Sequence, residues 1–144
     1  MEGAEKTVRI AIRDRPLDPA AALAEVERPG AGAVALFVGT VRDHSEARSG
    51  VTHLEYEAFE ERVEEAIGVI VGEALARWPI LAGVVEHRIG IVDLGGPAVV
   101  VAVSTAHRQD AFEAARYLID ELKARAPLWK KEHWPGGGEW IEGG

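Results

Sequence analysis

Two short segments combine side chains of types that can bind anions or transfer protons. The first, Ser104–Arg108, reads Ser-Thr-Ala-His-Arg and precedes a predicted helix, for which Ser104 or Thr105 can supply the N-cap. His107 and Arg108 would then place positive charge at the positive end of the helix dipole. A bound phosphate or carboxylate would resolve this conflict. In the alternative interpretation, Glu113 or Asp110 pairs with Arg108 while His107 only packs.

The second segment runs from Lys123 to Trp134 and combines lysines with tryptophans. On a helical projection Lys123 lies about 80° from the centre of the apolar stripe, at the border of the buried face, and Arg116 shares that side. Crowded cations lower the pKa of a lysine and prepare it for proton transfer. Alternatively, Asp120 pairs with Lys123 and the charges after it are solvated. The other members of the segment are Lys130, Lys131, His133, Trp129 and Trp134.

A third candidate lies where an apolar run ends in Gly39-Thr-Val-Arg-Asp-His44. Side chains at the junction of a strand and a loop often bind ligands, and the guanidinium of Arg42 can hold an anion with two hydrogen bonds. His44, His53 and His87 show no metal-binding spacing with one another or with nearby carboxylates. We therefore expect no metal site and no other cofactor.

Composition limits the chemistry further. The chain has 144 residues, a formal charge of −8, a pI near 5.1 and no cysteine. Without cysteine the chain has no thiolate metal site and carries no persulfide, so sulfur chemistry would need an external sulfur. The acidic pI argues against general nucleic-acid binding. A single domain spanning residues 1–144, with no signal sequence and no membrane span, is expected in the cytoplasm.

The negative charge is unevenly distributed. The segment Lys123–His133 carries a formal +3, which leaves −11 for the remainder of a chain whose total is −8. This contrast predicts a local anion-binding surface on an acidic protein.

Periodicity predicts the elements that position these residues. Strands are expected where residues alternate or form short apolar runs, and helices where apolar residues recur with a 3.6-residue period. The expected strands are 7–13, 33–38, 51–57, 83–91 and 97–105; the expected helices begin at 18, span 63–78 and span 109–125. This order favours an α+β domain, a mixed sheet with helices packed on it.

Several details of packing follow from the same patterns. The uninterrupted apolar runs 33–38 and 98–103 predict strands covered on both faces, with 98–103 central. In the first helix, Leu23 and Val26 are expected on the buried face. In the second, Gly68 and Gly72 are expected to allow close packing against a sheet.

Three ordered blocks of sequence resemble one known family. Phe37–His44, Ser104–Arg108 and Leu122–Glu132, in this order and spacing, are similar to the catalytic (large) subunit of molybdopterin synthase. The similarity extends from about Val34 to Trp140. Further matching blocks are Leu54–Glu57, Arg77–Pro79 and His87–Gly90.

The resemblance implies a hammerhead-like α+β subunit that forms a homodimer within a heterotetramer. Its partners would be two small ubiquitin-like sulfur-carrier subunits, each bearing a Gly-Gly thiocarboxylate tail. The implied reaction converts cyclic pyranopterin monophosphate (precursor Z) to molybdopterin by adding two sulfurs. The chain's own ending, Gly143-Gly144, is interpreted as coincidental.

The resemblance also assigns roles to residues. It implies that Lys123 is the principal catalytic lysine and that Lys130 is a second pocket lysine beside the inserted tail. The residues implied to contact substrate or its phosphate are Arg42, His107, Arg108 and Lys131, with His107 and Arg108 reaching in from the neighbouring protomer. Two alternatives remain: a noncatalytic adaptor for a ubiquitin-like carrier, and a phosphate-ester enzyme on the same scaffold.

Overall fold

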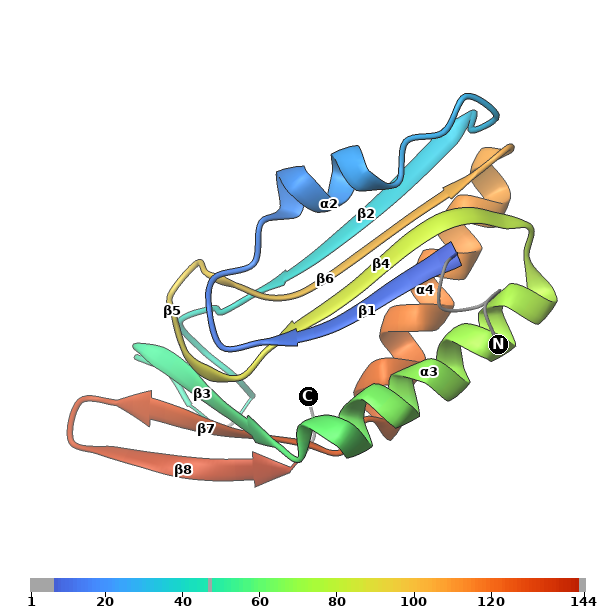
Figure 1. Ribbon diagram of the computed structural model, residues 1–144. Coiled ribbons are helices and arrows are strands. Elements are labelled where there is room, and N and C mark those ends of the chain that lie inside the picture. The colour runs from blue at the N-terminus through green and yellow to red at the C-terminus, as the bar shows by residue number, and fades with distance from the viewer. Residues whose placement is uncertain (1–6, 47, 143–144) are drawn as a thin grey trace.

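The computed structural model describes residues 7–46 and 48–142, which form two β-sheets and the helices that pack on them (Figure 1). Gly143 and Gly144, interpreted from the sequence as a coincidental ending, lie outside the described residues. The strands are β1 (Val8–Arg13), β2 (Ala33–Thr40), β3 (His53–Ala58), β4 (Ile80–Arg88), β5 (Gly90–Asp93), β6 (Pro97–Thr105), β7 (Leu128–Trp134) and β8 (Gly137–Glu142). The helices are α2 (Pro19–Glu25), α3 (Glu60–Arg77) and α4 (Arg108–Arg125).

The first sheet has the order β1-β4-β6-β2. β1 pairs with β4 in parallel, and the other pairs are antiparallel, so the sheet is mixed. β6 lies inside the sheet and is buried from Ala98 to Thr105, as its continuous apolar run predicts. The predicted α+β class, a mixed sheet with helices packed on it, is confirmed.

Helices cover both faces of this sheet. α3 and α4 lie together on one face, and α2 lies on the other (Figure 1). The predicted apolar stripes are confirmed, since the inward residues of both long helices are buried in the larger core cluster. Asp18, where the first helix was expected to begin, caps α2 by accepting a hydrogen bond from the Ala21 N–H. Leu23, however, is exposed, because Ala22 and Val26, spaced four apart, face the sheet instead.

The prediction that residues 33–38 are covered on both faces is wrong. β2 is the edge strand of the first sheet, paired on one side with β6. Val34 and Leu36 are 38% and 39% exposed, and Phe112 of the adjacent α4 is 69% exposed. An apolar run reports only that its side chains favour burial; nothing in the described chain covers this edge.

The second sheet has the order β5-β3-β7-β8 and is antiparallel. Sequence patterns predicted neither β7 nor β8, and they joined β4 and β5 into one strand. The break falls at Gly90, whose φ of 85° lies in the left-handed region and lets the chain turn from one sheet into the other. Six apolar side chains fill the junction between the sheets: Val41, Val51, Leu54, Tyr56, Val92 and Ala98.

The glycines of α3 have a different environment from the one expected. A Cβ added at Gly68 or Gly72 would meet no atom within 4 Å, so neither glycine allows close packing against the sheet. No helix in the described part of the chain is long and apolar enough to span a membrane.

Candidate active site

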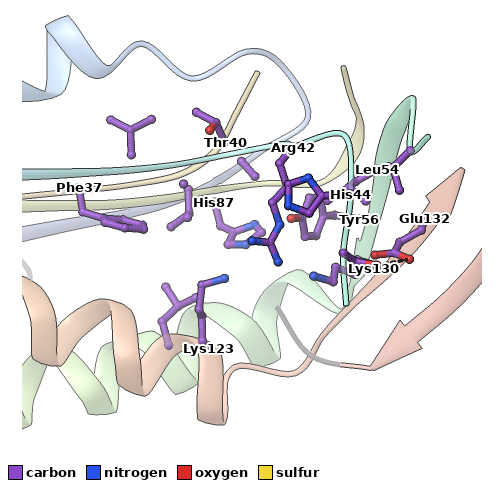
Figure 2. Close-up of a pocket in the computed structure, with 17 residues that line it drawn as sticks. Phe37, Thr40, Arg42, His44, Leu54, Tyr56, His87, Lys123, Lys130 and Glu132 are labelled. Atoms are coloured by element: carbon purple, nitrogen blue, oxygen red, sulfur yellow. Dashed lines mark hydrogen bonds between the residues drawn. The ribbon is translucent and has the colours of Figure 1, made fainter. Parts of the chain in front are cut away.

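A pocket of about 370 Å³ opens where the two sheets meet the C-terminal end of α4. This volume suits a small organic ligand. Figure 2 shows that its walls come from the end of β2 and the segment after it, β3, β4, β7 and α4. Segments far apart in the sequence therefore build one cavity.

Three cationic side chains point toward the same space in this pocket. Arg42 follows β2, Lys123 lies in the last turn of α4, and Lys130 lies on β7 (Figure 2). Burial of the Lys123 ammonium, followed by the charges of Lys130 and Arg42, lowers the pKa of Lys123. Its exposed flank lets solvent screen part of this effect. Arg42, Lys123 and Lys130 thus line one pocket; the residues alone grouped the two lysines, and the family resemblance added Arg42.

Local structure explains how the two lysines reach the pocket. Leu122 is buried in the core, and Lys123 follows it at the edge of the buried face of α4. On β7, alternation turns Leu128, Lys130 and Glu132 toward the pocket and the core. The inward residues of β7 include charges because they line a cavity.

The pocket is also lined by neutral aromatic side chains to which the sequence patterns assign no role. These are Phe37, Tyr56 and His87. Burial raises the pKa of Tyr56 to about 12 and, helped by the charge of Lys123, lowers the pKa of His87 to about 4, so both side chains are neutral near pH 7. The apolar periodicity of the surrounding strands does not indicate that these residues line a pocket.

Glu132 is an acidic side chain that lines the pocket. The alternative interpretation, in which the charges after Lys123 are solvated, did not predict this position. Glu132 is 3% exposed and accepts a hydrogen bond of 3.2 Å from the Ser45 hydroxyl. The segment after β2 is also held to the β7–β8 hairpin by Arg48, which stacks 3.7 Å above the Trp134 ring and pairs with Glu139 at 2.6 Å.

His107 and Arg108 lie at the opposite end of α4 from Lys123. Fifteen residues separate Arg108 from Lys123, about 22 Å along the helix axis. The predicted capping is wrong: His107 is the N-cap and no side chain bonds the helix terminus. Thr105 instead donates to the His107 carbonyl, and the buried Ser104 donates to the Ala82 carbonyl.

The alternative pairing of Arg108 is absent from the described residues. Glu113 accepts hydrogen bonds from Gln109 and Trp78, and neither Glu113 nor Asp110 forms an ion pair with Arg108 among residues 7–46 and 48–142. The Arg108 guanidinium therefore remains exposed at the start of α4.

Several other members of the basic segment lie outside the pocket. Lys131 faces the other side of β7, with its ammonium 5.6 Å from the centre of the Trp140 ring. Trp129 is also on that outer face. His133 stacks on His53 there, with ring centroids 4.2 Å apart. Arg116 pairs with Asp120, so it does not join the pocket cations.

The site can bind anions and transfer protons. Its cations attract negative groups, and a lysine whose pKa is lowered can act as general acid or base near neutral pH. In the described residues no group of three or more His, Asp or Glu side chains is arranged to hold a metal ion.

A two-sheet α+β domain with Arg42, Lys123 and Lys130 in a pocket at the sheet junction has the architecture and charge of a protein suited to small anionic ligands. Comparison with known proteins gives the family. The family model described as MoaE protein matches residues 12–125, and the chain belongs to this family.

Named relatives agree with this assignment. A molybdopterin synthase catalytic subunit from Mesorhizobium japonicum is 45% identical over 140 residues, covering 94% of this chain and 85% of the relative. The Bacillus subtilis protein of the same name is 39% identical, with coverages of 92% and 84%. The crystal structure of molybdopterin synthase from Staphylococcus aureus has a TM-score of 0.83 at 34% identity, covering 90% of this chain and 94% of that one.

A more distant neighbour shows the fold alone. It is a complex of subunits 1 and 2 of molybdopterin-converting factor from Helicobacter pylori, 20% identical with a TM-score of 0.71. The matched regions cover 92% of this chain and 89% of that one.

Proposed function

We propose that this protein is the catalytic subunit of a molybdopterin synthase and catalyses sulfur transfer in molybdenum cofactor biosynthesis. The observation that carries the proposal is the convergence of Arg42, Lys123 and Lys130 in one pocket of a MoaE-family fold. Its substrate is cyclic pyranopterin monophosphate. Its sulfur donor is the C-terminal Gly-Gly thiocarboxylate of a small ubiquitin-like carrier subunit.

The pocket charges suit both reactants. A thiocarboxylate and a cyclic phosphate are anions, and a shared set of cations holds them close while negative charge develops in the transition state. At each transfer the donor sulfur bonds to a side-chain carbon of the substrate and a carbon–oxygen bond there breaks; at one carbon the oxygen leaves as water, and at the other it stays on the phosphate as the cyclic ester opens. Water then hydrolyses each resulting thioester, which leaves the sulfur on the substrate and returns the tail as a carboxylate. Two such transfers give the dithiolene. The absence of cysteine in the chain fits a partner that supplies every sulfur atom.

Each pocket cation has a distinct part in this proposal. Lys123 transfers protons to and from the reacting atoms, because burial and neighbouring cations lower its pKa. Lys130 pairs with the inserted tail, and Arg42 binds substrate through its guanidinium fork. Substrate contact by Lys131 stays a prediction, since in a single chain this residue lies on the outer face of β7.

A second copy of the chain completes the site in this proposal. β2 is an exposed apolar edge, and such edges pair with another strand unless they are protected. His107 and Arg108 lie beside the start of β2, since Ala33 pairs with Thr105, whereas Arg42 follows its end. Antiparallel pairing of two β2 strands about a two-fold axis would set each start beside the partner's end. His107 and Arg108 of one protomer would then approach the pocket of the other.

The full assembly is proposed as a heterotetramer of two such chains and two carriers in the cytoplasm. The Helicobacter pylori fold neighbour is a complex of two different subunits, which is the kind of assembly that the proposal requires. No metal or other cofactor is needed for the proposed proton and sulfur transfers.

One assay separates this function from the alternatives. Cyclic pyranopterin monophosphate and thiocarboxylated carrier are incubated with and without this protein, and dithiolene product is measured. Product that depends on both the protein and the thiocarboxylate supports the synthase. Carrier binding without product would indicate an adaptor, and turnover of the substrate with no sulfur donor would indicate a phosphate-ester enzyme.

A further inference from the structure

His87 occupies a position in β4 where an apolar side chain would be expected. It is opposite Val99 of β6 and two residues beyond Val85, both of which belong to the core cluster under α3 and α4. The residue is only 2% exposed. Burying an imidazole here costs free energy unless its polar atoms are used.

One of its two ring nitrogens is committed within the protein. Nδ1 lies 2.7 Å from the carbonyl oxygen of Arg88, and a carbonyl only accepts, so Nδ1–H donates. In the neutral ring the proton on Nδ1 leaves Nε2 as an acceptor. The strand end of β4 thus fixes which nitrogen carries the lone pair.

The second nitrogen opens into the pocket. Nε2 makes no hydrogen bond to any atom of residues 7–46 and 48–142. His87 is one of the residues that line the pocket, so this nitrogen is the one available to a ligand there (Figure 2). The Tyr56 ring packs edge-on at 5.0 Å and holds the imidazole plane.

The polar groups of the pocket differ in whether they donate or accept hydrogen bonds. Arg42, Lys123 and Lys130 only donate hydrogen bonds, which suits the phosphate and the thiocarboxylate. Glu132, an acceptor, is next but one to Lys130 on the same face of β7 and already accepts from Ser45. His87 Nε2 is an acceptor in a lining that also includes Phe37 and Tyr56, whose rings suit a planar heterocycle, and His87 lies close enough to Lys123 for that charge to act on it.

We propose that His87 is a substrate-binding residue whose Nε2 accepts a hydrogen bond from a ring N–H group of the pterin. The pterin ring then lies against His87 and the neighbouring aromatic rings while its phosphate meets the pocket cations, so the fixed imidazole orients the substrate. This inference rests on the proposed function, since the pterin is the substrate of that reaction.

The test compares His87→Phe, which removes the acceptor, with His87→Gln, which retains one. Assays use the wild-type carrier at saturation and vary cyclic pyranopterin monophosphate. Loss of one hydrogen bond in a dry site predicts a 10- to 100-fold rise in KM for His87→Phe. His87→Gln should recover much of that loss. Thermal unfolding and carrier affinity, measured on the same samples, should stay close to wild type for His87→Gln.

Pterin analogues methylated at one ring nitrogen at a time provide a readout that a structural role would not move. One analogue should bind the wild type and His87→Phe equally, because it lacks the recognised N–H. Equal KM for wild type and His87→Phe would overturn the inference. So would a changed pH profile with unchanged KM, since His87 would then act on Lys123. If the wild type forms no dithiolene at all, the proposed function itself has failed.

Discussion

The chemistry proposed for Lys123 depends on charges that separate elements bring to it. Burial and the cations Lys130 and Arg42 all lower the pKa of Lys123, whereas Lys131 lies on the far side of the strand that carries Lys130. Adjacent lysines on one strand therefore differ in their effect on the site. This difference supplies a matched pair of variants.

Replacing Lys130 by glutamine should raise the pKa of Lys123, because one repulsive charge is removed. The limb of the kcat/KM–pH profile that reports Lys123 should move to higher pH, whether Lys123 acts as acid or base. Lys131→Gln removes the same charge from the outer face and should leave that limb in place. An equal shift in both variants would show that only net charge matters.

His87 should make stability depend on pH. Burial lowers its pKa to about 4 from the usual 6.5, so the unfolded chain binds more protons than the folded protein between these values. The contribution of His87 is complete above pH 6.5 and is lost as pH falls through this window. Linkage gives a loss of roughly 2 kcal/mol between pH 7 and pH 5.

Urea unfolding of wild type and His87→Phe at both pH values measures this loss. The variant should lose less stability than wild type on acidification. His107→Gln, a change at an exposed histidine, should keep the wild-type dependence. Identical losses in wild type and His87→Phe would contradict the burial argument.

At the scale of elements, apolar periodicity predicted the helices and strands whose side chains pack into the core. α3, α4 and β6 carry long apolar patterns and were predicted correctly. β7 was not predicted, because its inward positions include Lys130 and Glu132, which face a cavity and break the apolar alternation. The same polar residues that hid the strand are the ones that build the site. His87 was not predicted as a site residue, because the pattern of a buried strand does not indicate which of its residues lines a pocket.

The glycines of α3 offer a test of the helix itself. Glycine in a helix interior is less stable than alanine by about 0.5–1 kcal/mol, and a Cβ at Gly72 meets nothing within 4 Å. Gly72→Ala should therefore raise the free energy of unfolding by that amount, measured by urea titration. At Gly32 a Cβ would collide with the Ala106 carbonyl oxygen, so Gly32→Ala should destabilise the protein. A destabilised Gly72→Ala would show that the glycine has a packing role.

At the scale of the whole molecule, an acidic chain carries a basic pocket, which a second copy completes in the proposed dimer. The net charge is −8, while Arg42, Lys123 and Lys130 line the pocket. His107 and Arg108 lie at the far end of α4. No pattern within one sequence states which residues meet across a two-fold axis, so this part of the site came only from the family resemblance and stays a proposal.

Mixing two inactive variants tests the shared site. In a heterodimer of Lys123→Met and Arg108→Gln protomers, one site would combine an intact Lys123 with the partner's intact Arg108, and the other would lack both. Purified heterodimers should regain about half of the wild-type activity, while each variant homodimer stays impaired. Heterodimers no more active than the homodimers would show that Arg108 acts within its own chain.

The most direct test of the central claim is single-turnover formation of dithiolene by Lys123→Met. The variant is first shown to be folded and to bind thiocarboxylated carrier, and Lys131→Met serves as the matched control. We predict a rate at least 100-fold below wild type for Lys123→Met, the usual contribution of a positioned acid or base, and a much smaller change for Lys131→Met. A folded, carrier-bound Lys123→Met that forms product at the wild-type rate would contradict the catalytic assignment of this pocket.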